Sequence, residues 1–308
     1  MILSVVISQR DDAIGTSITV AGLLQSLKGL SFEIIVVDNS EENQRFAIDK
    51  EYLQDGTVKL LYTSPPSLFA ARAEGIKHAR GRWILILDSH MLMGYRGIEE
   101  LLEVAEGKDG NLGIVYGSCL YHVQNDRNGF IDRDLTTLFG IRNGDDFSTR
   151  RIAFRGVPML MEKAHFMRIG GYGTLARNYL PWGGGDFLLG IKTLMMGFEN
   201  WAVPKARGIH LGPFKKGPLT SSYMRVNDSK WPDFIGMMTA AFIVGGRNLL
   251  QERRKQVEKR IGRKKKSKGN ISYGEIERMA MRLGKTDYDV LRDNMVYSFY
   301  KLRKMYKR

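Results

Sequence analysis

Apolar and polar residues alternate in two different patterns along the first third of the chain. Short continuous apolar runs, which are typical of strands buried on both faces, are separated by segments whose apolar residues recur with helical spacing. The predicted strands are residues 3–8, 33–37, 58–62 and 83–87, and the predicted helices are residues 18–27 and 69–79. This alternation predicts an α/β fold that is Rossmann-like, with a mostly parallel central sheet flanked by helices.

The alternation becomes weaker after Gly94. There we expect strands at residues 112–121, 157–161 and 200–203, helices at residues 163–169 and 187–196, and a polar loop at residues 126–149. From Pro232 onward the spacing is helical, with a break at residues 265–272 and separate helices at residues 273–283 and 288–305. The fold is therefore expected to carry a C-terminal helical extension.

Length and composition limit the class of protein. A chain of 308 residues can bury a full core, and its single cysteine, Cys119, excludes an intramolecular disulfide bond. The first apolar run is too short and too soon followed by charge to be a secretory signal. The best apolar window, residues 234–244, is about half the length of a membrane span. We therefore expect a soluble or at most peripheral protein in the cytoplasm, which would be the host cytoplasm for a viral protein.

The positive charge is concentrated near the end of the sequence. The net charge is +14, and residues 251–308 hold 19 of the 47 Lys and Arg but only 7 of the 33 Asp and Glu. Such basic blocks favour polyanions, either nucleic acid or an anionic membrane surface, although a solvated tail that only keeps the protein soluble has the same composition. The residues expected to contact such an acceptor are Arg253, Arg254, Lys264, Lys265 and Lys266.

Asp88 and His90 follow an apolar strand in the sequence ILILDSH, residues 84–90. In a parallel sheet, ligands bind at the carboxyl ends of the strands, where Asp38 and Asp88 fall. A turn beginning at Ser89 would direct both side chains of the pair into a cleft. A carboxylate with an imidazole suits a divalent ion such as Mn²⁺. For an isolated Asp-x-His motif, a capped strand end with a surface histidine is the alternative.

Five segments of the sequence together carry a family resemblance. They are SVVISQRDD (4–12), EIIVVDNS (33–40), LFAARAEGIKHARGRWILILDSH (68–90), WGGGDFLLGIKTLMMGF (182–198) and GIHLG (208–212). In this order they resemble the GT-A-fold nucleotide-sugar glycosyltransferases of the family 2 type, and five weak motifs in order are more specific than any one of them. The Asp-Ser-His motif is similar to that of the polypeptide N-acetylgalactosaminyltransferases, which also share a Trp-Gly-Gly segment.

The resemblance implies a domain organisation. A GT-A domain would occupy residues 1–215, with its nucleotide-sugar half at about residues 1–95 and its acceptor half at about residues 96–215. The basic helical region would occupy residues 216–308.

The resemblance also assigns roles to individual residues. Asp88, His90 and His210 would bind the Mn²⁺ or Mg²⁺ that stabilises the charge of the leaving diphosphate. For His210 the alternative is an ordinary loop histidine, and for Asp38 it is a turn with the two residues that follow. For Arg72 the alternative is a surface position. The residues expected to line the nucleotide-sugar site are Ser8, Arg10, Asp12, Asp38, Arg72 and Asp88.

Asp186 is the candidate catalytic base. Family 2 enzymes usually have Glu-Asp at this place, whereas this chain has Gly185-Asp186, so the preceding acid is absent. The absence leaves open whether the sugar's anomeric configuration is retained or inverted. The alternative for Asp186 is a helix N-cap. Gly184 and Gly185 would contact the acceptor together with Trp182, which either stacks on a sugar or acceptor face or only packs.

These residues predict a metal-dependent glycosyltransferase that moves a sugar from a nucleoside-diphosphate sugar, expected to be a UDP-sugar, to an acceptor hydroxyl. The basic, aromatic tail favours a hydroxymethylated base of DNA as the acceptor, as in viral DNA modification. One alternative is a cell-envelope enzyme that acts on a lipid-phosphate carrier or a polysaccharide. Another is a non-catalytic nucleic-acid-binding module on a degenerate transferase fold. The sequence identifies no protein partner.

Overall fold

The computed structural model describes residues 2–42, 45, 53, 56–108, 110–121, 149–211, 232–264 and 272–305. Residues 126–148 of the predicted polar loop, residues 265–271 of the predicted helix break, and the basic residues Lys265 and Lys266 lie outside this part of the chain.

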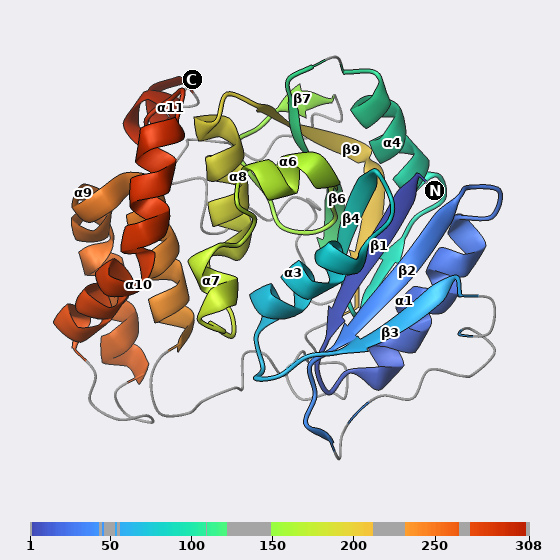
Figure 1. Cartoon of the computed structure of the whole chain (residues 1–308), viewed down its shortest axis with the longest axis horizontal. Helices are drawn as coiled ribbons and strands as arrows, with labels where there is room; N and C mark the ends of the chain where they lie inside the picture. Colours follow the sequence, from blue (N-terminus) through green and yellow to red (C-terminus); the bar gives the residue numbers. More distant parts are fainter. Residues whose placement is uncertain are drawn as a thin grey trace.

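Within the described ranges, nine strands form one mixed sheet (Figure 1). They are β1 (Leu3–Gln9), β2 (Phe32–Asp38), β3 (Val58–Tyr62), β4 (Trp83–Asp88), β5 (Met91–Met93), β6 (Leu112–Tyr121), β7 (Arg150–Arg151), β8 (Met159–Glu162) and β9 (Glu199–His210). The strand order is β3-β2-β1-β4-β8-β6-β9-β5, and β7 pairs with β9. The predicted strands of the first third are therefore confirmed, with small shifts at their ends.

Parallel pairing is confined to part of the sheet. β1 pairs in parallel with β2 and β4, and β2 pairs in parallel with β3, as predicted. β8 is antiparallel to both β4 and β6, whereas β9 is parallel to β6 and antiparallel to β5. β9 also continues to residue 210, well beyond the predicted strand at residues 200–203, because it alternates between buried and exposed residues instead of remaining apolar.

The helices of the described chain cover both faces of the sheet. They are α1 (Ala13–Ser26), α3 (Leu68–His78), α4 (Gly97–Glu106), α6 (Lys163–Arg168), α7 (Thr174–Arg177), α8 (Gly185–Met195), α9 (Pro232–Lys264), α10 (Tyr273–Asn294) and α11 (Phe299–Met305). In β4, Ile84 and Ile86 face the core formed with α3 and α8, whereas Leu85 and Leu87 face the core formed with α1 and α4. This period of two explains why the buried strands read as continuous apolar runs.

The C-terminal extension is helical, as predicted, and α9, α10 and α11 lie together beside α8 (Figure 1). Its buried side chains, from Phe234 to Leu302, belong to the same hydrophobic core as Val6 of β1. A division into domains near residue 215 stays a prediction. No helix within the described ranges is long and apolar enough to cross a lipid bilayer.

The predicted break between residues 283 and 288 is wrong. α10 runs without interruption from Tyr273 to Asn294, and the chain leaves the helix only after that point. Gly284 lies against α9, where an added Cβ would be 2.9 Å from the ring of Phe242. The absence of a side chain at Gly284 therefore allows α9 and α10 to pack closely, and this packing outweighs the low helix propensity of glycine.

Candidate metal and donor site

The candidate site lies at the carboxyl end of β4, where segments far apart in the sequence meet. β4 ends at Asp88, Ser89 and His90 form a tight turn as predicted, and β5 then pairs with β9 so that Met91 lies opposite His210. The backbone N–H of Leu211 donates to the carbonyl oxygen of His90 at 2.8 Å. Strand pairing therefore brings His210 beside the turn, 122 residues after Asp88.

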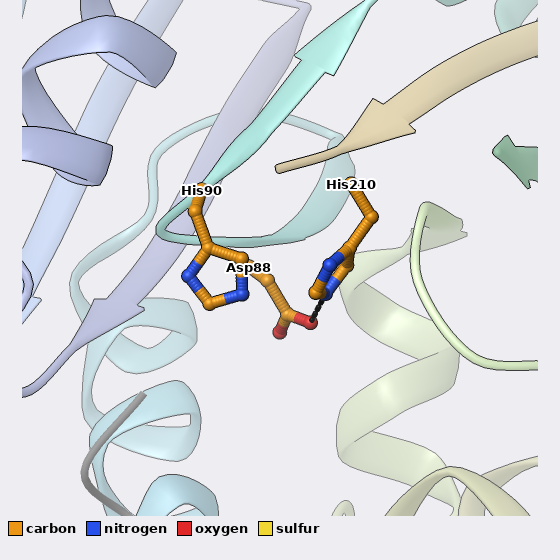
Figure 2. A group of neighbouring side chains, drawn as sticks. All are labelled: Asp88, His90 and His210. Atoms are coloured by element: carbon orange, nitrogen blue, oxygen red, sulfur yellow. Dashed lines mark hydrogen bonds and ion pairs between the residues drawn. The ribbon is translucent and has the colours of Figure 1, made fainter. Parts of the chain in front are cut away.

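Figure 2 shows that Asp88, His90 and His210 converge on one point. One donor atom from each residue lies within 4.8 Å of the others. Nε2 of His210 is 3.2 Å from Oδ2 of Asp88, and the two imidazole rings are 4.5 Å apart at 78° to each other. Both histidines are buried, whereas Asp88 is partly exposed. The residues predicted to bind metal are thus brought together, and His210 is not an ordinary loop histidine.

This donor set fits a divalent cation. It offers one carboxylate oxygen and two imidazole nitrogens, a combination that divalent transition metals accept. Donors bound to the same small ion lie at most about 4.2 Å apart. A small movement of the side chains would therefore close the group around an ion.

Arg72 joins this group to the candidate base. It belongs to α3, is only 2% exposed, and its Nη2 donates to Oδ1 of Asp88 at 2.8 Å. Its Nη1 lies 3.0 Å from Oδ1 of Asp186 and 3.4 Å from the hydroxyl of Tyr172. The alternative of a surface arginine is therefore wrong. Arg72 is a buried cation shared by two carboxylates.

The two carboxylates differ in their pKa. Burial by itself raises the pKa of Asp88. The hydrogen bond with His210 and the charge of Arg72 lower this pKa by more than burial raises it, so the pKa lies below the ordinary value. Burial raises the pKa of Asp186, and the charge of Arg72 offsets only part of that rise. Asp88 is therefore held ionised, as a metal ligand must be, while Asp186 is the stronger base.

Asp186 lies in the first turn of α8, as expected for a residue presented at a helix start. The N-cap of this helix is Gly184, in the left-handed conformation with φ of 80°, and no side chain caps the helix. The alternative that Asp186 serves as the N-cap is therefore wrong. At Gly185, an added Cβ would lie 2.1 Å from the ring of Phe69 on α3. The place of the family's usual acid is thus occupied by an aromatic ring.

The other predicted nucleotide-sugar residues lie along the ends of β1 and β2. Ser8 lies opposite Asp88, and Asp38 lies opposite Gln9, in the strand register. Oδ1 of Asp38 accepts a hydrogen bond from the backbone N–H of Ser40 at 2.9 Å. This bond is the turn considered as the alternative for Asp38, and its contact with a nucleotide stays a prediction.

Arg10 and Asp12 both follow β1 but have different surroundings. Arg10 is 3.6 Å from the carboxylates of Asp11 and Glu41. The carboxylate of Asp12 is buried beneath the turn that carries His90, at 2.6 Å from Nδ1 of that ring. Arg10 thus pairs with two acidic neighbours, and Asp12 lies behind the group formed by Asp88, His90 and His210.

The residues predicted to contact the acceptor are not all in one place. Trp182 is 37% exposed in the loop before α8. Arg253 on α9 is half-buried, with its guanidinium carbon 5.5 Å from the centre of the ring of Phe187, the residue after Asp186. Arg254 is exposed and forms an ion pair with Glu258 at 2.8 Å, and Lys264 is the last residue of α9. Arg253 therefore contacts α8.

Sequence reasoning missed Tyr172 and Phe69. Tyr172 is buried, and a buried tyrosine usually has a hydrogen-bond partner for its hydroxyl. That partner is Arg72. For Phe69 there was no signal, because the contact with Gly185 joins two helices more than a hundred residues apart.

The sheet order and the helices on both faces match the GT-A fold. The family described as glycosyl transferase family 2 matches residues 17–170, which is half of the chain. The chain therefore belongs to glycosyl transferase family 2. The resemblance found in the sequence is confirmed.

One solved structure shows the extent of the shared fold. The crystal structure of GalNAc-T7 with UDP, GalNAc and Mn²⁺ is similar to this chain with a TM-score of 0.65 and 17% sequence identity. The similarity covers 99% of this chain and 56% of that one, so this chain spans little more than half of its length. No curated protein matches the sequence.

Proposed function

We propose that the protein transfers a sugar from a nucleoside-diphosphate sugar, with a UDP-sugar as the expected donor, to an acceptor hydroxyl in the presence of Mn²⁺ or Mg²⁺. The observation that carries the proposal is the convergence of Asp88, His90 and His210 beside the Arg72–Asp186 pair in a family 2 glycosyltransferase. The GalNAc-T7 structure, which contains UDP and Mn²⁺, supports the choice of donor and metal.

The three metal residues would hold the cation, which supplies the charge that stabilises a leaving diphosphate. Asp88 is oriented for this task, because Arg72 occupies Oδ1 and leaves Oδ2 toward His210. Ser8, Arg10 and Asp38 would line the nucleotide pocket at the ends of the neighbouring strands. The fixed charge of Arg72 lies next to the metal group without needing to reorganise during the reaction.

Asp186 would take the proton of the acceptor hydroxyl. Its Oδ1 is held by Arg72, so the proton would go to Oδ2. A raised pKa favours this role, since a general base works best when its pKa approaches the working pH. Trp182 and the glycine loop precede Asp186 directly, and they would contact the acceptor there.

Substitutions test the enzymatic part of the proposal. The protein with Mn²⁺ should cleave a UDP-sugar from a panel of donors, and Asp88→Ala should abolish both cleavage and Mn²⁺ binding. Asp186→Asn should lower transfer to an acceptor by at least about 100-fold while Mn²⁺ affinity is kept. If no donor is cleaved and Asp88→Ala changes nothing, the chain is a non-catalytic module.

The proposed acceptor is DNA that carries a hydroxymethylated base. The support is the basic excess of residues 251–308, together with the exposure of Arg254, Lys255 and Lys259 on α9 and the contact of Arg253 with α8. A base would have to leave the stack for its hydroxyl to reach Asp186.

Mass spectrometry of DNA after incubation with Mn²⁺ and UDP-sugars tests this acceptor. Sugar mass should appear on hydroxymethylated DNA and not on unmodified DNA of the same sequence. Duplex binding should weaken steeply with salt, and the slope of log affinity against log salt should fall when Arg254 and Lys255 are both changed to Ala. Transfer only to a lipid phosphate or a glycan, with binding to anionic vesicles, would replace DNA as the acceptor.

A further inference from the structure

Asp12 is buried behind the candidate metal group instead of facing a nucleotide pocket. Its side chain has no exposed surface, and its Oδ2 lies 2.6 Å from Nδ1 of His90 and 2.5 Å from Oγ of Ser89. A carboxylate enclosed in this way cannot contact a donor molecule without leaving the core. Its hydrogen bonds are instead made to the turn that presents a metal residue.

We propose that Asp12 is a positioning residue that fixes the ring and the tautomer of His90 for metal binding. An ionised carboxylate only accepts hydrogen bonds, so Nδ1 of His90 must carry the hydrogen that is donated to Asp12. Nε2 is then the nitrogen left with a lone pair for a cation. Carboxylates that hold a metal-binding histidine in this manner increase metal affinity in other proteins by about 10–100-fold.

Helix α1, which follows Asp12, also holds the turn that carries His90 in place. Thr19 on α1 donates through Oγ1 to the carbonyl of Ser89 at 2.9 Å, and the same oxygen accepts from the N–H of Met91 at 3.0 Å. α1 therefore fixes the backbone of the turn, while Asp12 fixes the imidazole. Because these two tasks belong to different side chains, they can be separated by substitution.

The inference rests on the proposed metal site and is tested first on metal affinity, not on catalysis. Asp12→Asn is nearly isosteric, but its amide can donate to Nδ1 and so favour the tautomer with a hydrogen on Nε2, as in a protease whose aspartate was changed in this way. We expect Asp12→Asn to weaken Mn²⁺ binding by about 10–100-fold, measured from the electron paramagnetic resonance signal of free Mn²⁺.

Nitrogen-15 NMR of histidine-labelled protein provides the second readout. At a pH high enough for the ring of His90 to be neutral, wild-type His90 should carry its hydrogen on Nδ1, and the Asp12→Asn variant should carry it on Nε2. His90→Ala identifies the signal. Asp12→Glu should recover part of the Mn²⁺ affinity, since it restores a carboxylate acceptor.

Thr19→Val is the matched control. It removes the hydrogen bonds to Ser89 and Met91 and should lower the Tm, but it should leave the hydrogen of His90 on Nδ1, because the carboxylate of Asp12 is kept. If folded Asp12→Asn binds Mn²⁺ as tightly as wild type, or keeps the hydrogen on Nδ1, the inference is overturned. If Mn²⁺ binding depends on Asp12 as expected but no UDP-sugar is cleaved, the proposed function fails and the inference stands.

Discussion

At the scale of single residues, the most constrained side chain of the site is Arg72. It is almost fully buried, and it neutralises two carboxylates, Asp88 and Asp186, that are each only partly exposed to solvent. Breaking a buried ion pair by removing one partner costs more than the pair contributes, because the other charge stays behind without compensation. Arg72 therefore holds Asp88 and Asp186 together.

Arg72→Met removes the shared cation while keeping most of the side-chain volume. We expect the free energy of unfolding to fall by about 3 kcal/mol, measured by urea denaturation. Arg82→Ala is the control, since the Arg82 side chain is 63% exposed and its pair with Glu162 should contribute less than about 1 kcal/mol. Equal losses in the two variants would contradict the role given to Arg72.

Glu33 is a second buried charge, on β2 and away from the site. Burial by itself raises the pKa of Glu33. Hydrogen bonds from Lys59, from the N–H of Arg80 and from Ser4 have the larger, opposite effect and lower the pKa to about 2. Because the folded-state pKa is below the unfolded value, this carboxylate stabilises the fold above about pH 4.5, and the stabilisation is lost as the pH falls toward about 2.

Glu33→Gln should therefore lower the free energy of unfolding near pH 7 by up to about 3 kcal/mol. The difference between the variant and the wild type should shrink as the pH is lowered from about 4.5, since the wild type loses the same contribution there. Urea denaturation at several pH values measures both effects. Glu103→Gln on α4 is the control, because this exposed residue should show neither.

The metal residues could be predicted from the sequence, but their support could not. Asp88, His90 and His210 stand in motifs whose order identifies a family. The partners Asp12 and Tyr172 depend on which side chains meet after the helices pack. Hydrogen bonds of this kind leave no periodic signal in the sequence, so they became visible only in the structure.

At the scale of elements, the contact between α3 and α8 decides what position 185 can carry. The ring of Phe69 fills the space where a side chain of residue 185 would lie. With Phe69 in this place, a larger residue at position 185 would overlap the aromatic ring.

Gly185→Ala should lower the free energy of unfolding by about 2 kcal/mol, because the added methyl group overlaps the buried ring. Phe69→Leu should relieve part of this cost, so that the double variant is more stable than the sum of the two single changes predicts. Thermal unfolding of the wild type, the two single variants and the double variant, monitored by circular dichroism, measures these differences. In Gly274→Ala, where the nearest atom would be 3.6 Å away, a change below about 1 kcal/mol is expected.

Buried strands were predicted well and exposed ones poorly. The bounds of β6 match its apolar run, and those of the buried strand β4 differ from the prediction by one residue, whereas β9 was predicted too short, because its second half alternates between core and solvent. The false break in α10 has a related cause. A glycine in a helix has the same appearance in the sequence whether it ends the helix or admits a neighbour.

At the scale of the whole molecule, the C-terminal helices share the hydrophobic core of the sheet. The N-terminal turns of α9 press against the glycine loop, where a Cβ on Gly236 would lie 2.7 Å from the carbonyl oxygens of Trp182 and Gly183. Ile276 of α10 is fully buried in the core that also contains the α3 face of the sheet. We therefore expect the described parts to unfold together.

Ile276→Ala should lower the free energy of unfolding by about 3 kcal/mol and shift the tryptophan fluorescence transition by the same amount. This probe is informative because every tryptophan precedes α9 in the sequence. Val290→Ala, at a position 60% exposed on the same helix, should change the transition by less than about 0.5 kcal/mol. A tryptophan transition that does not move in Ile276→Ala would show that α10 unfolds separately.

The pairing of β5 with β9 has a consequence for the kinetics of folding. It joins His90 to His210 across a long stretch of chain, and contacts of such high sequence separation cost the most loop-closure entropy. The proposed cation site is therefore complete only when this pairing is made, which we expect to happen late in folding. Bound metal should accordingly slow unfolding and leave the rate of folding nearly unchanged, because it would stabilise the native state and not the transition state that precedes it.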